Sequence, residues 1–473
     1  MAASRVLSLS KSRAAPVKGT PLKRNRRQFL AATGHAFAGL ALSACAVRPE
    51  DGELPPLALS QASPDRGKSI VGPLREDPKG LLDLPDGFSY RVVSQLGQRM
   101  DDGFTVPDAA DGMGCFDLGN GELALVRNHE LMPQNPGGEV AGLAYDTLAD
   151  TAVPLPGGTT TVVLDANSLA LKRQYRSLAG TIRNCAGGTT PWGSWLTCEE
   201  AVVAAGGPLN QDHGYVFEVP ATAPGLIDPV PLTAMGRFNH EAACVDPHTG
   251  IVYLTEDRHD SLFYRFLPTQ PGNLAAGGTL QALVLDGYLD TRNWGKKRDL
   301  AVRQRISGRW ITLDNVEAPD DDLRVRGAAA GAAQFARGEG IYMGEGEVYF
   351  TATSGGLVRQ GQIFRLRPGR QAGATDTLDL FFESGDKAQY SFGDNLCVSP
   401  NGHLVVCEDQ YGEVVDNFLR GITPRGESYP LARLHRQTEL AGACFSPDGR
   451  TLFVNAYSPT LTFAIQGPWP AST

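Results

Sequence analysis

The chain has 473 residues and a formal net charge of −9, with 52 Asp and Glu against 43 Lys and Arg. This acidic balance argues against nucleic acid as a partner, because proteins bind phosphate backbones through positively charged surfaces. With 55 Gly, 32 Pro and no long helical periodicity, the sequence favours many short strands joined by turns and excludes a predominantly helical fold.

The chain begins with a predicted export signal. Residues 23–30 (Lys-Arg-Asn-Arg-Arg-Gln-Phe-Leu) are basic and precede a small, weakly apolar run over residues 31–44. This order is typical of a twin-arginine signal, which the twin-arginine translocase recognises and which directs folded proteins out of the cytoplasm. We therefore expect a periplasmic or extracellular protein. Removing residues 1–44, with eight Lys and Arg and no Asp or Glu, takes the net charge to −17, which favours cations as ligands.

The signal ends at Cys45, in the sequence Leu-Ser-Ala-Cys, which resembles a lipoprotein processing site. Two outcomes stay open: lipidation of Cys45, which would anchor the protein to a membrane, and ordinary cleavage near the same point. We assign residues 1–45 to the signal, residues 46–80 to a linker and residues 81–468 to a folded domain. Most other cysteines lie in apolar, strand-like runs, so buried free thiols are expected rather than disulfides.

A hairpin pattern recurs along the predicted domain. Each copy has a short apolar strand, a turn containing glycine, and a second apolar strand that ends in acidic or amide residues; a third strand follows several copies. Because one hairpin cannot bury its own sheet face, radial stacking into an all-β, six-bladed β-propeller is predicted, with two β-sandwiches as the alternative. The copies lie at residues 112–130, 184–200, 239–257, 337–353, 394–409 and 441–455.

The spacing between copies is longest between the third and the fourth. This predicts an insertion over about residues 272–335, which would form loops on one face of the propeller. A monomer is expected.

Acidic residues are expected to gather at one mouth of the propeller channel. In each blade the first strand starts, and the second strand ends, at the same face. Carboxylates crowded there repel one another by several kcal/mol unless cations neutralise them. Taken singly, each acidic residue also fits a solvated turn position, and Cys185 also fits a buried apolar position. The predicted metal ligands are Cys185, Glu200, Glu241, Glu339, Glu130, Glu256 and Glu408. Corresponding positions are occupied by Asp111, by either Asp394 or Asn395, and by Asn455.

The residue types indicate which ions would bind. Oxygen-rich surroundings suit Ca²⁺, whereas a thiolate among carboxylates suits a transition metal such as iron. Arg337 lies two residues before Glu339 and is expected either to hold that carboxylate in an ion pair or to grip two phosphoryl oxygens. Metal ions beside an arginine are suited to displacement at phosphorus.

Residues 184–200 (Asn-Cys-Ala-Gly-Gly-Thr-Thr-Pro-Trp-Gly-Ser-Trp-Leu-Thr-Cys-Glu-Glu) resemble the signature segment of PhoX-type alkaline phosphatases. The segments at residues 127–130, 237–241, 337–339 and 445–455 are similar to other segments of that family, and the resemblance spans roughly residues 80–458. It implies a hydrolase of phosphomonoesters with an axial centre of Fe³⁺ and Ca²⁺. The residues that it implies are Cys185, Glu200, Glu241 and Glu339 as metal ligands and Arg337 as the phosphate contact, with Arg337, Glu339 and Cys185 as the catalytic set.

Two other functions stay open from the residues alone. A calcium-dependent lactonase or arylesterase would also occupy a six-bladed propeller with axial Ca²⁺, but it gives no role to Cys185. A non-catalytic periplasmic binding or scaffolding propeller would use calcium only to tie blades together. Glu130, Glu256 and Glu408 are predicted from the ring of acidic residues alone.

Overall fold

The computed structural model describes residues 70–469 apart from 138, 139, 150, 296, 297, 371–373, 411 and 413. The chain divides into two compact units, residues 1–52 and 53–473, and every described residue belongs to the second. The predicted export signal, Cys45 and residues 46–69 of the predicted linker lie outside the described residues. Among the helices that are described, none is long and apolar enough to cross a membrane.

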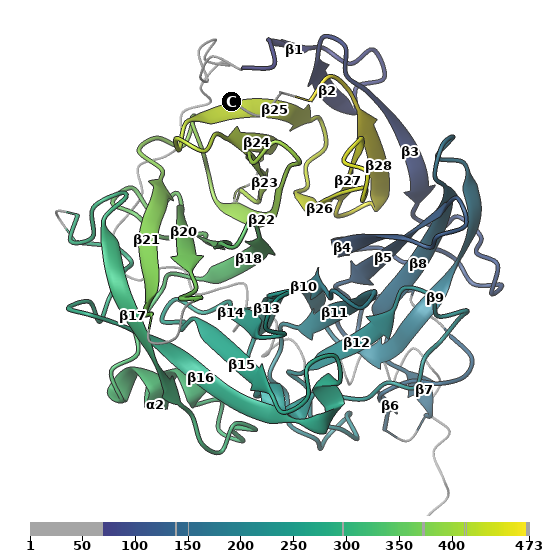
Figure 1. Cartoon of the computed structure of the whole chain (residues 1–473). Helices are drawn as coiled ribbons and strands as arrows, with labels where there is room; N and C mark the ends of the chain where they lie inside the picture. The colour runs from purple at the N-terminus through teal and green to yellow at the C-terminus, as the bar shows by residue number, and fades with distance from the viewer. Residues whose placement is uncertain are drawn as a thin grey trace, which may run out of the picture. The chain divides into compact units, whose positions relative to one another are not determined.

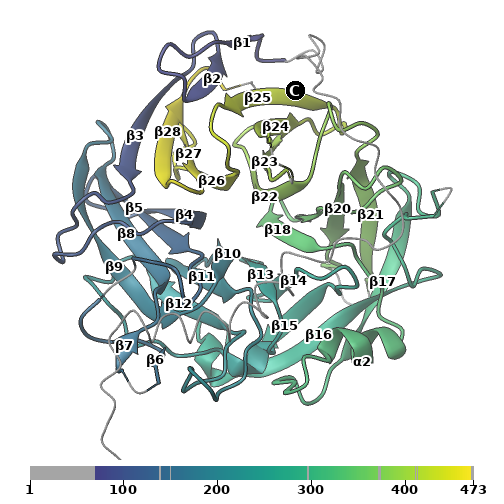
Figure 2. The ribbon, with the colours of Figure 1, turned by 180° about the vertical axis from the view of Figure 1, so that it is seen from behind.

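Six inner strands pack in a closed ring at the centre of the second unit, each beside the next (Figures 1 and 2). Each inner strand pairs with an antiparallel second strand that follows it directly in the chain. The inner strands are β4 (Ala110–Asp117), β10 (Asn184–Thr189), β13 (His240–Val245), β18 (Gly338–Met343), β22 (Gly393–Val398) and β26 (Leu440–Phe445). The second strands are β5 (Glu122–His129), β11 (Ser194–Glu199), β14 (Val252–Glu256), β19 (Val348–Ala352), β23 (Leu404–Glu408) and β27 (Thr451–Ala456).

Outer strands extend each hairpin away from the ring. The third strands are β8 (Gly157–Asp165), β12 (Val216–Pro220), β15 (Tyr264–Pro268), β20 (Gln362–Arg367), β24 (Phe418–Ile422) and β28 (Leu461–Gln466). The outermost strands are β9 (Leu171–Thr181), β16 (Gly278–Leu285), β17 (Arg305–Thr312), β21 (Asp376–Glu383), β25 (Ser428–Leu434), β3 (Ser89–Gln95), β2 (Leu82–Pro85) and β1 (Leu74–Arg75). The short β6 (Thr147–Leu148) and β7 (Val153–Pro154) pair with each other, and the helical segments are η1 (Thr233–Met235), η2 (Leu274–Ala276) and α2 (Leu323–Ala329).

The ring closes between the two ends of the described chain. β3 pairs antiparallel with β28, so a strand from the start of the domain completes the sheet formed by its end. The apolar core lies between neighbouring sheets, where alternate strand residues meet. The rings of Phe263 and Phe350, for example, stack with centroids 4.2 Å apart and pack the blade of β13 against the blade of β18.

The prediction of an all-β propeller is confirmed, and the six predicted hairpins coincide with the six pairs of inner and second strands. Counted by hydrogen bonding, the described residues form five sheets of three or more strands, because β17 pairs with both β16 and β21 and joins two blades. The number of blades therefore depends on whether sheets or inner strands are counted. The predicted insertion over residues 272–335 holds β16, β17 and α2 in addition to loops.

Candidate metal centre

Each of the six inner strands carries an irregularity at the same place. The ladder to the second strand shifts register after the strand's first or second residue, so that two residues lie opposite one. Such a β-bulge leaves a residue unpaired and re-aims its side chain. The first residues within these bulges are Asp111, Cys185, Glu241, Glu339, Asp394 and Gly442. Five of six equivalent positions thus carry a side chain that can bind a metal.

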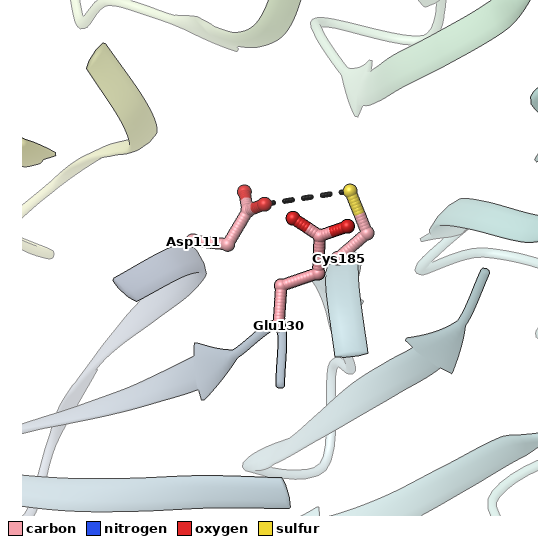
Figure 3. A group of neighbouring side chains, drawn as sticks. All are labelled: Asp111, Glu130 and Cys185. Carbon is pink, nitrogen blue, oxygen red and sulfur yellow. Dashed lines mark hydrogen bonds between the residues drawn. The ribbon is translucent and has the colours of Figure 1, made fainter. Parts of the chain in front are cut away.

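These side chains converge. Three groups have potential ligand atoms within 4.8 Å of one another, and neighbouring groups share a member. Figure 3 shows the first group, in which the side chains of Asp111 on β4, Cys185 on β10 and Glu130 just after β5 approach one another. The Cys185 thiol lies 3.4 Å from Asp111 Oδ2 and 3.2 Å from Glu241 Oε1. We call the seven residues of the three groups the axial cluster: Asp111, Glu130, Cys185, Glu200, Glu241, Glu339 and Asp394.

The second strands supply a further set of acidic residues. Glu130, Glu200, Asp257 and Asp409 each follow the last residue of β5, β11, β14 and β23, respectively. Glu130 and Glu200 lie just beyond the last residue pair of their strands, and their side chains belong to the axial cluster. The structure therefore brings together the sequence-predicted residues Cys185, Glu200, Glu241, Glu339 and Glu130.

Two arginines interleave with the acidic groups. Arg337 Nε and Nη2 donate to the Asp257 carboxylate at 2.7 and 2.9 Å, and Nη2 also donates to Glu339 Oε1 at 2.7 Å. Arg183 pairs with Glu130 at 2.8 Å and with Glu200 at 3.0 Å. Each arginine lies directly before an inner strand, with φ of +47° for Arg183 and +57° for Arg337. Non-glycine residues held in this left-handed region gather at functional sites, where packing compensates the strain.

The buried carboxyl groups of the axial cluster have shifted pKa values that favour bound cations. Burial, and after it repulsion from neighbouring carboxylates, raises the pKa of Asp111 and Glu241 well above its usual range. Burial likewise raises the pKa of Asp394 to about 8. Asp257 behaves differently: burial alone would raise its pKa, but the Arg337 guanidinium lowers it to about 2. Several of these carboxyl groups therefore hold protons near neutral pH unless bound cations replace them.

The donor atoms fit metal ions. Asp111 Oδ1 and Glu241 Oε2 are buried, and neither accepts a hydrogen bond from any described residue. A buried acceptor without a donor is costly, so these two oxygens indicate a missing positive partner. The set of carboxylate oxygens suits Ca²⁺, and the single thiol among them suits a softer ion such as iron.

Glu256 and Glu408 require a correction, because the structure does not bring them into the axial cluster. Each is the last residue of its second strand and pairs across the ladder with a residue that precedes the bulge. Glu256 Oε2 accepts a hydrogen bond from the Tyr264 hydroxyl at 2.7 Å, and Glu408 Oε1 accepts one from Arg420 Nε at 2.8 Å. Both carboxylates therefore stabilise their own blades.

Sequence reasoning missed the residues that take those places. Asp257 directly follows Glu256, and Asp409 directly follows Glu408. In each pair the glutamate is bound within its blade, whereas the aspartate lies at the mouth. Arg183 was also missed, although it stands two residues before Cys185 as Arg337 stands two residues before Glu339. That shared spacing was the available signal.

The chain is similar to known proteins in sequence and in fold. The family described as alkaline phosphatase PhoX matches residues 70–170 and 165–460. PhoX of Pseudomonas fluorescens in complex with vanadate, a transition-state analogue, has 21% sequence identity and a TM-score of 0.65, covering 85% of this chain and 97% of that chain. A gluconolactonase of Xanthomonas campestris has 14% identity and a TM-score of 0.37, covering 84% and 98%. No curated protein matches.

Proposed function

We infer the function from the premise that this chain belongs to the PhoX family of alkaline phosphatases. The chain is accordingly a phosphatase, and we propose that it hydrolyses phosphomonoesters at the channel mouth. In this proposal the axial cluster holds calcium and iron, and Arg337 holds the phosphoryl group. The observation that carries it is the overlap of the three ligand groups, which share Cys185 and Glu241, in a mouth that also contains Arg337.

The residues divide between two tasks. Cys185, with Asp111 and Glu241 beside its thiol, would hold iron, whereas the remaining carboxylates of the axial cluster would hold calcium. Bound in this way, the cations would neutralise the carboxylates, activate an oxygen nucleophile and stabilise negative charge on the leaving oxygen.

Arg337 is the phosphate-binding group in this proposal. Its guanidinium is partly exposed and presents a planar fork, which matches two phosphoryl oxygens in a bidentate contact. Asp257, with its pKa of about 2, stays ionised at neutral pH and holds the guanidinium in one orientation through two hydrogen bonds. Glu339 shares Arg337 with Asp257, so Glu339 links the phosphate-binding group to the axial cluster.

The lactonase and scaffold alternatives give no role to Cys185. In the structure its thiol contacts two carboxylates of the axial cluster and not an apolar core, which favours a metal centre that uses sulfur. Membership of the PhoX family favours phosphatase activity, so we propose that function over the two alternatives.

We further propose that residues 1–45 direct export through the twin-arginine translocase to the periplasm or beyond, and that the folded protein is a monomer. The basic stretch at residues 23–30 supports export. Fractionation of cells that produce the wild-type chain or Cys45→Ala separates lipidation from ordinary cleavage: lipidation places only the wild type in the membrane fraction, and ordinary cleavage leaves both soluble.

Elemental analysis joined to an activity assay tests the proposed centre. The protein is purified through its own export route, and hydrolysis of p-nitrophenyl phosphate is measured before and after chelation and after return of Ca²⁺. We expect bound calcium and iron, loss of hydrolysis on chelation, and loss in Cys185→Ala and Arg337→Ala. Hydrolysis that persists without metal, or a protein that contains calcium alone, would contradict the proposal.

A further inference from the structure

A shelf of planar and cationic side chains lies beside Arg337. The guanidinium of Arg292 lies 4.6 Å and that of Arg359 lies 5.0 Å from the centroid of the Trp294 ring, and the His259 ring meets Trp294 edge-on at 6.0 Å. We call these four residues, His259, Arg292, Trp294 and Arg359, the rim shelf. Cation–π and aromatic contacts of this kind hold planar and cationic side chains together.

Backbone hydrogen bonds attach the rim shelf to the segments that position Arg337. The Arg337 N–H donates to the carbonyl of Arg258, the residue before His259, at 2.9 Å. The Arg337 carbonyl accepts from the Thr353 N–H at 2.9 Å, and the next residue, Ser354, accepts from Trp294 Nε1 at 2.8 Å. His259 thus directly follows one backbone partner of Arg337, and Trp294 donates a hydrogen bond to the residue that follows the other partner.

Further contacts hold the shelf together. Arg292 Nη1 donates to the His259 carbonyl at 3.1 Å, and the Gly356 N–H donates to the Arg292 carbonyl at 2.9 Å. Arg292 therefore joins the segment of His259 to the loop that carries Arg359. The shelf is one connected surface made from three separate parts of the chain.

The charges on the shelf are unequal. Arg292 donates to the Asp290 carboxylate at 2.9 and 2.7 Å, so its charge is compensated. Arg359 is exposed and its guanidinium contacts the Trp294 ring, and no carboxylate among the described residues forms an ion pair with it. Leu357 and Val358 beside it are 40% and 44% exposed. The shelf therefore offers an exposed cation without a carboxylate partner, next to planar rings and exposed apolar side chains. His259 lies close enough to Arg337 and Asp257 to be affected by their charges, so the shelf borders the acidic mouth.

We propose that the rim shelf binds the leaving group of the substrate. The preferred substrates are then phosphomonoesters whose alcohol carries a planar aromatic base. Nucleoside 5′-monophosphates are the class of compound that fits. This inference rests on the proposed function, because Arg337 must hold the phosphoryl group for the leaving group to reach the shelf. A base stacks on a guanidinium or an aromatic ring through its π-face, which needs no particular hydrogen-bonding pattern. An alcohol without a planar aromatic ring would not stack on the shelf.

A pair of substrates isolates the base. In adenosine 5′-monophosphate and ribose 5-phosphate the same primary 5′ oxygen leaves phosphorus with the alcohol, and the two compounds differ by the adenine. We expect the metal-loaded wild type to favour adenosine 5′-monophosphate in kcat/KM. Arg359→Gln and Trp294→Leu should lower the ratio of the two kcat/KM values about tenfold, the order expected for one lost stacking contact. Arg309→Gln is the matched control, because Arg309 is exposed on the outer strand β17.

A binding measurement keeps this inference separate from the proposed function. Affinity for the same two compounds is measured by calorimetry on the wild type, Arg359→Gln and Trp294→Leu. Tighter binding of adenosine 5′-monophosphate that both variants remove supports the shelf, whether or not either compound is hydrolysed. Equal binding of the two compounds by the wild type, or variants that weaken both compounds equally, would overturn it. Failure to hydrolyse either compound with metals bound would instead count against the phosphatase proposal.

Discussion

Cys185 and Glu241 occupy equivalent bulges on the neighbouring inner strands β10 and β13, and the Cys185 thiol lies 3.2 Å from Glu241 Oε1. Burial, and then the nearby Asp111 and Glu241 carboxylates, raises the pKa of this thiol well above its usual range, so in the metal-free protein a proton holds the contact together. A cation between the sulfur and the oxygen would take the place of that proton. Both residues belong to two ligand groups, which makes them the link between the groups.

Replacing the Cys185 thiol should remove the softer metal selectively. In Cys185→Ser we expect iron to fall below detection while calcium is largely retained, because the carboxylates that suit calcium are unchanged. Hydrolysis should fall more than the roughly 10–100-fold that follows loss of a group that only orients a metal ligand. Elemental analysis and p-nitrophenyl phosphate turnover measure both effects. Cys244→Ala, on β13 beyond the bulge, is the control and should keep its iron; an unchanged iron content in Cys185→Ser would contradict the assignment.

The two arginines should separate substrate binding from metal binding. Arg337→Lys keeps the charge but loses the bidentate fork, so we expect kcat/KM to fall about 100-fold with weaker inhibition by inorganic phosphate. Arg183 has its donors on Glu130 and Glu200, and Arg183→Lys should therefore change calcium content more than phosphate affinity. Calcium stoichiometry and the inhibition constant of phosphate are measured on both variants. Equal effects of the two substitutions on both quantities would show that the arginines do not divide these tasks.

Glu256 and Asp257, at the end of β14, allow a matched test of which carboxylate lies at the mouth. Asp257→Asn removes the charge that orients Arg337 at the mouth, and we expect the KM for p-nitrophenyl phosphate to rise about tenfold with weaker phosphate inhibition. Burial raises the pKa of Glu256 to about 7, so Glu256→Gln replaces a group that is about half protonated at neutral pH. That variant should keep its metals and its KM and lose at most about 1–2 kcal/mol of unfolding free energy. A larger rise in KM for Glu256→Gln than for Asp257→Asn would reverse the placement.

The hairpin repeat was visible in the sequence because strand residues alternate and turns punctuate them. The copy predicted at residues 394–409, for example, became β22 and β23 at Gly393–Val398 and Leu404–Glu408. The bulges could not be predicted, because an unpaired residue does not change the pattern of apolar residues along a short strand. A slip of one residue turns a side chain to the other face, which is why Glu256 was chosen where Asp257 lies at the mouth. The pairing of β17 with β21 joins residues far apart in the chain, as in Arg305 with Asp379, and no local pattern indicates it.

A buried imidazole between two carboxylates should contribute to stability. His213 Nδ1 lies 2.7 Å from Glu199 Oε1, and Nε2 lies 3.2 Å from Asp146 Oδ2. Burial alone would lower the pKa of His213, but Glu199 and then Asp146 raise it to about 9. His213→Leu leaves two carboxylates without their cation, and we expect it to cost about 3–5 kcal/mol of unfolding free energy at pH 7.

The pH dependence of this contribution has a definite sign. Because the folded-state pKa is raised, the stabilisation is complete below the unfolded pKa of about 6.5 and is lost as pH rises through about 9. Urea unfolding of the wild type and His213→Leu should therefore give a difference that shrinks between pH 7 and pH 10. A difference that grows over this interval would mean that the histidine is neutral in the folded protein.

The acidic mouth should make the metal-free protein less stable as pH rises. Burial raises the folded-state pKa of Asp394 to about 8 and raises that of Asp111, Glu200, Glu241 and Glu339, whereas the unfolded carboxyl groups titrate near about 4. Between these values the folded chain binds more protons than the unfolded chain, so the stability present below about pH 4 is lost as pH rises through about 8. The His213 contribution is constant below its unfolded pKa of about 6.5 and starts to fall above it, so thermal unfolding between pH 5 and pH 6.5 reports on the carboxylates. We expect the melting temperature in chelator to fall across that interval and the fall to be abolished by Ca²⁺, because bound cations replace the protons. Asp394→Asn should flatten the slope in chelator, since it removes one of the groups whose ionisation the fold opposes. A melting temperature in chelator that climbs from pH 5 to pH 6.5 would mean that the carboxylates are ionised in the metal-free fold and that cations are not required to hold them together.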